Sequence, residues 1–397
     1  MAVDAAPSSG EELAGVLRDA AERKQIIELG GHFTKRGMGG KVAAPDVVAS
    51  TRGLKRVLAY EPNDLTISVE AGLPYHELRS TLESQGQFLP LDPPFDETAT
   101  IGGVIATNNS GPRRRRYGTA RDMVIGMTFA TLAGKLVRSG GMVVKNVTGL
   151  DMAKLMVGSF GTLAAMVSVN FKVFPRPAEE GTFLATSESL APLLSLRTAI
   201  LRSKLQPVAI DLLNPGAAAL AGQPDAHYCL GLEAGGNRAL VERHEREWGA
   251  LARENGATDF RTLDRPGAAS FWGKVREFPA LATSGNSTAS VLRISSEPKN
   301  LGGMLSTVRS AGTYAVLARA AAAVVYIACP DLDSARRCLS DCRSRGFRAI
   351  VESCPPDQKE ALELWPHPGS QFAVMQRIKD QFDPHHLLNP GRLYNLI

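Results

Sequence analysis

The sequence predicts an α+β protein with more than one domain. Its 397 residues correspond to two or three domains at roughly 100–200 residues each. Of the 38 glycines, 21 lie in the first 165 residues, where they separate short β-type runs. Beyond residue 177 strands alternate with longer helical stretches, which indicates a second α+β domain.

The composition excludes several classes of protein. Lys and Arg number 45 and Asp and Glu 40, and the resulting net charge of +5 is too small for dedicated nucleic-acid binding. The sequence has no uninterrupted apolar run of the roughly 18 residues that span a bilayer. Its N-terminal segment lacks the positive start and apolar stretch of a signal peptide. We therefore expect a soluble, cytoplasmic protein.

The cysteines predict neither a disulfide framework nor a metal centre. They are odd in number and form no C-x-x-C pair, which favours reduced, structural thiols. Cys338 and Cys342 are spaced to share a helical face, but no nearby Cys or His cluster completes a zinc or iron–sulfur set. The five cysteines are Cys229, Cys329, Cys338, Cys342 and Cys354.

The elements of the first half are short. Residues 11–23 carry apolar side chains at positions 13, 16, 17 and 20, which predicts an amphipathic helix. A strand over residues 25–29 follows and stops at Gly30-Gly31. Residues 168–173 alternate in polarity, which predicts a strand with one face in water. Further strands are expected over residues 54–58, 66–69 and 128–132, the last before a hairpin turn at 133–135.

The second half is predicted to be a separate α+β domain that ends in an ordered tail. Pro175-Arg176-Pro177 marks its beginning. Residues 372–382 are predicted to be helical, and the prolines and glycine of residues 383–391 prevent a regular element after them. We find no internal repeat. The expected strands are 227–232, 291–294 and 324–328, and the expected helices are 190–205 and 237–253.

Common phosphate and nucleophile motifs are missing. Gly40-Lys41 is followed by Val42 instead of Ser or Thr, so the P-loop pattern fails. The dinucleotide fingerprint fails at the same point, because Val42 stands where its third glycine belongs. No G-x-S-x-G nucleophile elbow occurs, which weakens the hydrolase and Rossmann interpretations.

Two glycine-rich loops, each placed after a predicted strand, remain. They lie at residues 30–35 and 98–112 and contain the pairs Gly30-Gly31 and Gly102-Gly103. Glycine lets backbone N–H groups approach a ligand closely, and consecutive amides form anion-binding nests. The loops suit a pyrophosphate, with two ordinary turns as the alternative.

The second loop carries a recognisable pattern. Thr100 to Ala106 is followed by Gly111-Pro112-Arg113-Arg114, Tyr117-Gly118 and Arg121-Asp122. This run resembles the second FAD loop of the vanillyl-alcohol-oxidase/PCMH flavoprotein superfamily.

Two further segments narrow the resemblance. The string from Gly140 through Lys145-Asn146 and Gly149 to Asp151 continues through residues 158–163 to Pro177. It is similar to the corresponding stretch in the E-subunit family of bacterial glycolate oxidases. Phe382-Asp383-Pro384, with Asn389 to Arg392, resembles the end of many FAD-linked oxidases. The likeness covers residues 25–177 and the tail, and is loose between them.

The resemblance implies a fold of two α+β subdomains that bracket FAD, and a cap domain with an antiparallel sheet and helices. It assigns residues 1–178 to a PCMH-type FAD-binding domain and residues 179–370 to the cap. Residues 371–397 would be a tail that returns to the FAD domain.

The resemblance also implies roles for individual residues. Gly31 to Lys35 would hold the pyrophosphate, with Thr34 as a hydroxyl donor. Thr100 to Gly103 and Ala106 to Asn108 would contact the flavin and the ribityl chain, and Asn389 and Arg392 would return toward the flavin. Gly161, Thr162 and Val167 would lie near the adenine side. The complete implied FAD-binding set is Gly30, Gly31, His32, Phe33, Thr34, Lys35, Thr100, Ile101, Gly102, Gly103, Ala106, Thr107, Asn108, Gly111, Tyr117, Gly118, Gly161, Thr162, Val167, Asn389 and Arg392.

Some positions depart from the family pattern. His32 and Phe33 stand where small residues are more common, and His32 is shifted by one residue from the histidine that binds FAD covalently in some members. We therefore expect non-covalent FAD. Only the first two of the four arginines at residues 113–116 match the pattern. A solvated basic loop is the interpretation chosen for this run, with contact to an acidic partner as the alternative.

Substrate contacts are less clear in the sequence. Arg293 lies in an apolar strand and is the candidate for gripping a substrate carboxylate, with an outward-facing arginine as the alternative. The tail histidines His385 and His386 are not expected to act as a base. The D subunits of glycolate oxidases and the related D-lactate dehydrogenases carry an H-x-G-x-G-x-x-H type motif, which this chain lacks.

By resemblance, the chain is expected to be the FAD-binding subunit of a glycolate dehydrogenase complex that oxidises glycolate to glyoxylate. Its expected partners are a flavoprotein D subunit and an iron–sulfur F subunit, and its expected location is the cytoplasm or, through those partners, the inner-membrane surface. Two alternatives stay open: a self-contained FAD-dependent 2-hydroxy-acid dehydrogenase, and a non-catalytic partner subunit.

Overall fold

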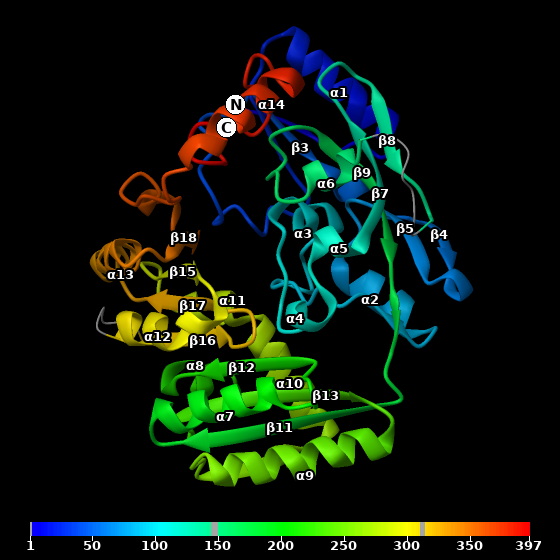
Figure 1. The fold of residues 1–397 in the computed structure, drawn as a ribbon. Helices are drawn as coiled ribbons and strands as arrows, with labels where there is room; N and C mark the ends of the chain where they lie inside the picture. The colour runs from blue at the N-terminus through cyan, green and yellow to red at the C-terminus, as the bar shows by residue number, and fades with distance from the viewer. Residues whose placement is uncertain (1, 144–149, 310–313) are drawn as a thin grey trace. The chain divides into compact units, whose positions relative to one another are not determined.

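The structure, a computed structural model, describes residues 2–143, 150–309 and 314–397. The chain divides into two compact units (Figure 1). Unit 1 comprises Met1–Ser110, Gly118–Arg176 and His367–Ile397, and unit 2 comprises Gly111–Tyr117 and Pro177–Pro366. Unit 1 is therefore assembled from segments at both ends of the chain.

Unit 1 contains a parallel sheet, a larger antiparallel sheet and a two-stranded ribbon. The parallel sheet has the order β1 (Val3–Ala5), β3 (Val47–Ser50), β2 (Ile27–Gly30). The antiparallel sheet has the order β4 (Val57–Glu61), β5 (Thr66–Glu70), β9 (Ala165–Lys172), β7 (Val124–Ala130), β8 (Leu136–Gly140). The ribbon pairs β6 (Gln87–Phe88) with β10 (Phe174–Pro175).

Helix α1 (Gly10–Glu22) packs between these two sheets. It begins after Ser9, whose hydroxyl accepts a hydrogen bond from the Glu12 amide, as an N-cap does. Leu13 and Leu17 on its inner face are fully buried in one apolar cluster with residues of β2, β3, β7 and β9. The helix predicted from these positions is confirmed. The remaining helices of unit 1 are α2 (Tyr75–Glu83), α3 (Ile101–Thr107), α5 (Ala120–Met123), α6 (Met152–Met156) and α14 (Phe372–Phe382).

The prediction of one wet face for residues 168–173 is only partly confirmed. They belong to β9, the central strand of the antiparallel sheet. Ser168 is only 6% exposed, and Val169 and Phe171 are fully buried. Asn170 and Lys172, on the same face of the strand as Ser168, are partly exposed, so the polar face meets solvent only toward the end of the strand.

Unit 2 is built on one antiparallel sheet of eight strands. Its order is β14 (Asp259–Leu263), β11 (Glu179–Ser187), β13 (Tyr228–Gly236), β12 (Ala209–Leu213), β16 (Ala315–Arg319), β17 (Val324–Cys329), β15 (Ser290–Ser295), β18 (Arg348–Ser353). One apolar cluster holds α7 (Leu190–Arg202), α9 (Arg238–Glu254), α12 (Leu301–Arg309) and α13 (Leu332–Ser344) to one face. A second holds α8 (Pro215–Leu220), α10 (Arg265–Arg276) and α11 (Phe278–Thr283) to the other.

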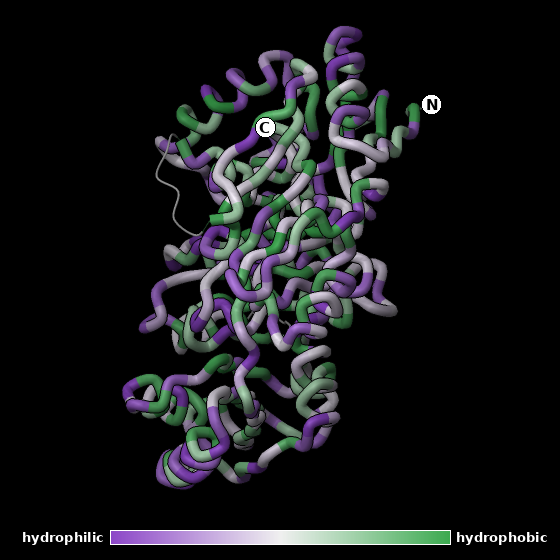
Figure 2. Tube along the Cα trace, turned by 90° about the vertical axis from the view of Figure 1, so that its right-hand side faces the viewer, coloured by the Kyte–Doolittle hydropathy of each residue, from purple (hydrophilic) through white to green (hydrophobic). Residues whose placement is uncertain are grey.

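The surface helices of unit 2 are amphipathic. Helix α9, the lowest element in Figures 1 and 2, is mostly hydrophilic in Figure 2, yet its Trp248 is fully buried. The Trp248 ring packs edge-on against Phe183 of β11 at a centroid distance of 5.8 Å. Burying one large aromatic side chain in this way anchors a largely polar helix.

The sheet of unit 2 repeats one topology twice. Apart from the short helix α8 between β12 and β13, the successions β11-α7-β12-β13-α9-β14 and β15-α12-β16-β17-α13-β18 are both β-α-β-β-α-β motifs. Their strand orders mirror each other across the pairing of β12 with β16. No internal repeat was found in the sequence, because the shared topology needs only a similar pattern of burial and not similar residues.

The tail docks on unit 1 through a buried ion pair. Lys379 of α14 has its Nζ 2.6 Å from Oδ2 of Asp383, and both side chains are almost fully buried. The same Nζ donates to the carbonyls of Thr162 and Leu388. Burial lowers the pKa of Lys379, and the Asp383 carboxylate opposes this. The predicted helix at 372–382 and the ordered, irregular segment after it are confirmed.

Candidate functional site

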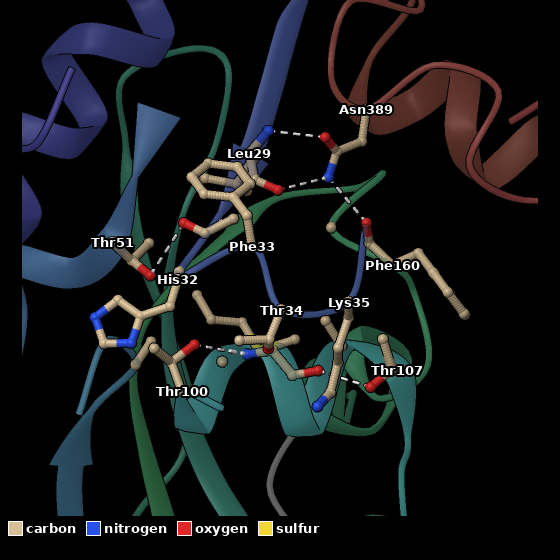
Figure 3. A pocket seen from close by; sticks show the side chains of 18 of the residues that line it. Leu29, His32, Phe33, Thr34, Lys35, Thr51, Thr100, Thr107, Phe160 and Asn389 are labelled. Carbon is tan, nitrogen blue, oxygen red and sulfur yellow. Dashed lines mark hydrogen bonds between the residues drawn. The ribbon is translucent and has the colours of Figure 1, made fainter. Parts of the chain in front are cut away.

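A cavity opens in unit 1 where the end of β2, the helix α3 and the tail meet (Figure 3). Its space is about 750 Å³ when the open mouth is included. Glycines and threonines form one part of its wall, and small or aromatic apolar residues another.

The first glycine loop forms one wall of the cavity. The backbone N–H groups of Gly31, His32, Phe33 and Thr34 donate no hydrogen bond to any residue that the structure describes. Phe33 has a φ of 57°, a left-handed conformation that is unusual for an aromatic residue. Such a conformation within a run of free amides is a component of anion-binding nests. The loop therefore offers an anion several backbone donors.

Close packing holds this loop in place. A Cβ on Gly31 would lie 2.1 Å from Oγ1 of Thr100, so only glycine lets the loop pack on the start of α3. The hydroxyl of Ser50, at the end of β3, donates to the Gly31 carbonyl at 2.8 Å. The Gly31 carbonyl of the loop is thus held by the end of β3.

The second glycine segment is helical, and the prediction of a loop after a strand is wrong here. Thr100 caps α3, and its hydroxyl accepts a hydrogen bond from the Gly103 amide. A Cβ on Gly102 would touch Ala71 at 3.1 Å, whereas a Cβ on Gly103 would meet only Oγ1 of Thr100 at 3.3 Å. Because Gly103 also lines the cavity, a larger side chain there would project into it.

The tail closes the cavity from the other end of the sequence. The Asn389 amide accepts from the Leu29 N–H at 2.8 Å and donates to the carbonyls of Leu29 and Phe160 (Figure 3). Arg392 donates to the carbonyls of Lys35 at 3.1 Å and of Gly40 at 3.3 Å. Both residues bind backbone of unit 1, so they position the loops around the cavity.

The cavity is positively charged. Arg36 forms two hydrogen bonds with the Glu28 carboxylate at 2.7 and 2.8 Å. Lys35 and Arg392 also line the cavity, so three basic side chains stand against one acid. Burial lowers the pKa of Arg392 to about 10, with Glu28 opposing the shift and Arg36 adding to it, and the group stays protonated at neutral pH. This charge suits a phosphate-bearing ligand.

The structure brings most of the predicted FAD-binding residues together and leaves some elsewhere. Ile101 is buried, and Asn108 ends α3 in a left-handed conformation. The Thr162 hydroxyl donates to the Ser159 carbonyl, and Val167 packs against α1. Gly118, like Gly111 and Tyr117 of unit 2, lies outside the lining. The predicted residues that line the cavity are Gly30, Gly31, His32, Phe33, Thr34, Lys35, Thr100, Gly102, Gly103, Ala106, Thr107, Gly161, Asn389 and Arg392.

Sequence reasoning missed several lining residues. Thr51 follows β3, which pairs in parallel with β2, so both strands end at the same edge beside the cavity. The pairing of β2 with β3 was not predicted from the sequence. A prediction of that pairing would have identified Thr51 as a candidate lining residue. The other missed residues are Glu28, Leu29, Arg36, Ala71, Phe160, Ala164 and Met166.

The interpretation of the arginine run as a solvated loop is wrong for its first two residues. Residues 114–117 form the short helix α4 (Arg114–Tyr117) in unit 2. Arg113 pairs with Glu233 of β13 at 2.6 Å, and Arg114 is partly buried. Arg115 and Arg116 are exposed, as a solvated run requires.

Arg293 does not simply point outward from its strand. Its Nε donates to Oε2 of Glu352 at 2.8 Å, and its side chain is 33% exposed. Burial lowers the pKa of Arg293, but Glu352 and Tyr326 together outweigh this, so the pKa of Arg293 is raised. Of the tail histidines, His386 contacts Asp380 at the surface. Lys145, Asn146 and Gly149 of the recognised string lie outside the described residues.

Two protein-family profiles match segments of the chain that line this cavity. The profile of the FAD binding domain matches residues 1–140, and that of the C-terminal domain of FAD linked oxidases matches residues 367–393. The first contributes Gly31 and Thr100 to the lining, and the second Asn389 and Arg392. Both segments are thus similar to FAD-linked oxidases. The prediction of FAD as the cofactor is thereby confirmed.

Curated relatives of this chain include two glycolate oxidase subunits. Glycolate oxidase subunit GlcE of Escherichia coli (strain K12) is 37% identical over 199 residues, which cover 49% of this chain and 54% of that protein. Glycolate oxidase subunit GlcD of Bacillus subtilis (strain 168) is 25% identical, over 98% of this chain and 88% of the relative. The chain thus spans about half the length of GlcE.

Solved structures confirm the fold class. The 4-ethylphenol oxidase from Gulosibacter chungangensis matches with a TM-score of 0.77 at 14% identity, covering 99% of this chain and 89% of its own. The predicted α+β class, with a PCMH-type FAD-binding fold and a further antiparallel sheet in unit 2, is confirmed.

The residues of the cavity fit FAD. Free amides at Gly31 to Thr34 suit a pyrophosphate, and Lys35 and Arg392 supply positive charge. The open side of Gly103 leaves room for a close approach of the ligand to the backbone. Among the described residues, no helix is long and apolar enough to cross a membrane, and no His, Cys, Asp and Glu cluster is arranged to hold a metal ion.

Proposed function

We propose that this chain is the FAD-binding subunit of a glycolate dehydrogenase complex and takes part in the oxidation of glycolate to glyoxylate. The observation that carries the proposal is the cavity itself, which joins free loop amides to the tail of an FAD-linked oxidase. The partial match to GlcE supports the choice of subunit, and both glycolate oxidase relatives support glycolate as the substrate.

The proposal assigns each part of the cavity a task. The amides of residues 31–34 and the Thr34 hydroxyl bind the pyrophosphate, and Lys35 balances its charge. Thr100 to Gly103 and Ala106 to Asn108 hold the flavin and ribityl part, and Gly161, Thr162 and Val167 lie toward the adenine. Asn389 and Arg392 keep the loops in position, since both bind backbone carbonyls there.

FAD, when bound, accepts a hydride from the α-carbon of a 2-hydroxy acid. The task of this chain is to bind FAD, to exclude water from the bound cofactor and to orient the 2-hydroxy acid. Arg293 is the proposed contact for the substrate carboxylate, because its terminal nitrogens contact no acceptor among the described residues.

The proposed partners are a flavoprotein D subunit and an iron–sulfur F subunit. Support comes from the sequence, which lacks the H-x-G-x-G-x-x-H type motif of D subunits and offers no Cys cluster for an iron–sulfur centre. Electrons would then leave through another polypeptide, at the cytoplasmic face of the inner membrane. One observation favours an alternative: the match to GlcD over 98% of this chain is compatible with a self-contained 2-hydroxy-acid dehydrogenase.

Flavin content and turnover of the isolated chain test the proposal. The purified chain should carry FAD that acid releases, and it should reduce an artificial dye with glycolate slowly or not at all. Addition of the two partners should restore dye reduction. A chain that is colourless and takes up no added FAD contradicts the FAD assignment. An isolated chain as fast as the full assembly supports the self-contained enzyme instead.

A further inference from the structure

A group of charged side chains lies on one face of the unit 2 sheet. Arg319 of β16 and Asp211 of β12 are paired residues in the sheet and form a buried ion pair. Arg293 of β15 stands opposite Tyr326 of β17 and pairs with Glu352 of β18. Two arginines are therefore each matched by one carboxylate.

Arg114 adds a third positive charge to this group. It lies on α4, which packs against β12, and it interacts electrostatically with Arg293, Arg319, Tyr326 and Glu352. Within the part of the chain that the structure describes, its guanidinium makes no hydrogen bond and no ion pair. Its neighbour Arg113 is held by Glu233. The group around Arg114 thus carries one more positive than negative charge.

Other donors around Arg114 are also unused. The terminal nitrogens of Arg293 contact no acceptor in the described ranges, and neither does the hydroxyl of Tyr326. Tyr326 is 7% exposed, and its ring lies 5.5 Å from the Arg319 guanidinium. Arg293 is one-third exposed, so solvent reaches the group at its side.

The charges around Arg114 favour the binding of an anion. Burial lowers the pKa of Arg114, and Arg293 and Arg319 lower it further, while Tyr326 and Glu352 only partly oppose them. Placing a partly buried cation among like charges is unfavourable, and a bound anion removes this repulsion. A guanidinium fork with a nearby hydroxyl matches the two oxygens of a carboxylate.

We propose that Arg114, with Tyr326 and Arg293, forms a carboxylate-binding site within unit 2 that takes the acid group of the substrate. The identification of the bound carboxylate as substrate rests on the proposed function. The site itself depends only on the contacts of unit 2. Arg114 is then a substrate-binding residue, and Glu352 is a positioning residue that orients Arg293.

Binding of a 2-hydroxy acid without a transferable hydrogen tests this site. The FAD-loaded chain is titrated by calorimetry with 2-hydroxyisobutyrate and with the corresponding neutral amide. Wild type should bind the carboxylate and bind the amide much more weakly. Arg114→Gln should weaken carboxylate binding about ten- to a hundredfold, the range for a hydrogen bond to a charged group, and leave the affinity for the amide unchanged. Tyr326→Phe should have a smaller effect in the same direction.

Arg115→Gln is the matched control, because Arg115 is the exposed neighbour of Arg114 on the same helix. It should bind the carboxylate like wild type. Arg114→Lys keeps the positive charge but lacks the two-pronged guanidinium. Its affinity for the carboxylate should lie between those of wild type and Arg114→Gln, and such an intermediate affinity would also show that the loss in Arg114→Gln is not a folding defect. Equal effects of Arg114→Gln and Arg115→Gln, or equal binding of acid and amide by wild type, overturn the proposal.

The FAD content of each protein separates this inference from the proposed function. Full FAD occupancy with carboxylate binding insensitive to Arg114 overturns the site and leaves the FAD-dependent function standing. A wild-type protein without FAD contradicts the proposed function, and the titrations still decide whether unit 2 binds a carboxylate.

Discussion

The cavity of unit 1 and the charged face of unit 2 present different kinds of hydrogen-bond donor. The cavity presents backbone amides at Gly31 to Thr34, made accessible by glycines and held by Asn389 and Arg392. The face of unit 2 presents side chains, Arg293, Arg319 and Arg114, brought together by strand register. The difference teaches that backbone sites depend on local sequence, whereas side-chain sites depend on which strands become neighbours.

The largest effect is expected where the cavity depends on the lack of a side chain. Gly103→Val should abolish FAD binding, because the new side chain has room in the protein and projects into the cavity. FAD occupancy is measured by absorbance after purification and titration. Gly15→Val is the matched control, a helical glycine of unit 1 with no neighbour within 4 Å of an added Cβ. Retained FAD in Gly103→Val would show that the cavity is not the FAD site.

The tail is the part of unit 1 that depends on charged side chains. Lys379→Met leaves Asp383 buried without its partner, and breaking a buried pair costs about 3–5 kcal/mol. The free energy of unfolding from urea titration should fall by that amount. Asp380→Asn removes the exposed contact with His386 and the smallest of the electrostatic effects on Lys379, and it should cost less than about 1 kcal/mol. Similar losses in both variants would contradict a structural role for the buried pair.

Arg392→Ala tests whether the tail positions the backbone donors. It removes the hydrogen bonds to the carbonyls of Lys35 and Gly40, and we expect the Kd for FAD to rise about ten- to a hundredfold. The unfolding free energy should change less than in Lys379→Met. His385→Ala, an exposed tail residue, serves as the control. An unchanged Kd in Arg392→Ala would mean that the loop holds its shape without the tail.

The smallest effect concerns a helix cap near the recognised motif. The Asp122 carboxylate accepts hydrogen bonds from the amide and hydroxyl of Thr119. The Thr119 amide lowers the pKa of Asp122, partial burial opposes this, and the Thr119 hydroxyl lowers it further. Because the folded pKa lies below the unfolded value of about 3.9, the stabilisation is present above that pH and is lost as the pH falls through the folded pKa.

Asp122→Ala should therefore destabilise the protein by about 0.5–1 kcal/mol at pH 7. The difference in unfolding free energy between wild type and Asp122→Ala should become smaller as the pH falls below about 4. Urea titrations at several pH values measure it. A gap that widens at low pH would show that the carboxylate is not stabilised by this cap.

Local sequence was enough to predict much of this protein. The apolar spacing of residues 11–23 predicted α1, and the span 372–382 predicted α14. The family resemblance, carried by the glycine segments and the tail motif, singled out 14 residues that line the cavity. These features follow from contacts between residues close in sequence, or from the conformational freedom of glycine, so their signal is present in a short segment.

Other features were decided only by the tertiary structure. The alternation in residues 168–173 predicted more exposure than the structure has, because β9 is the central strand of its sheet and Ser168 is buried there, while Asn170 and Lys172 are partly exposed. Residues 98–112 were predicted as a loop, but the Thr100 cap stabilises a helix in spite of two glycines. The mirrored motifs of unit 2, the place of Thr51 beside β2 and the group around Arg114 all depend on strand neighbours far apart in sequence. No short segment carries that information, because register and pairing are set by the burial of the whole sheet.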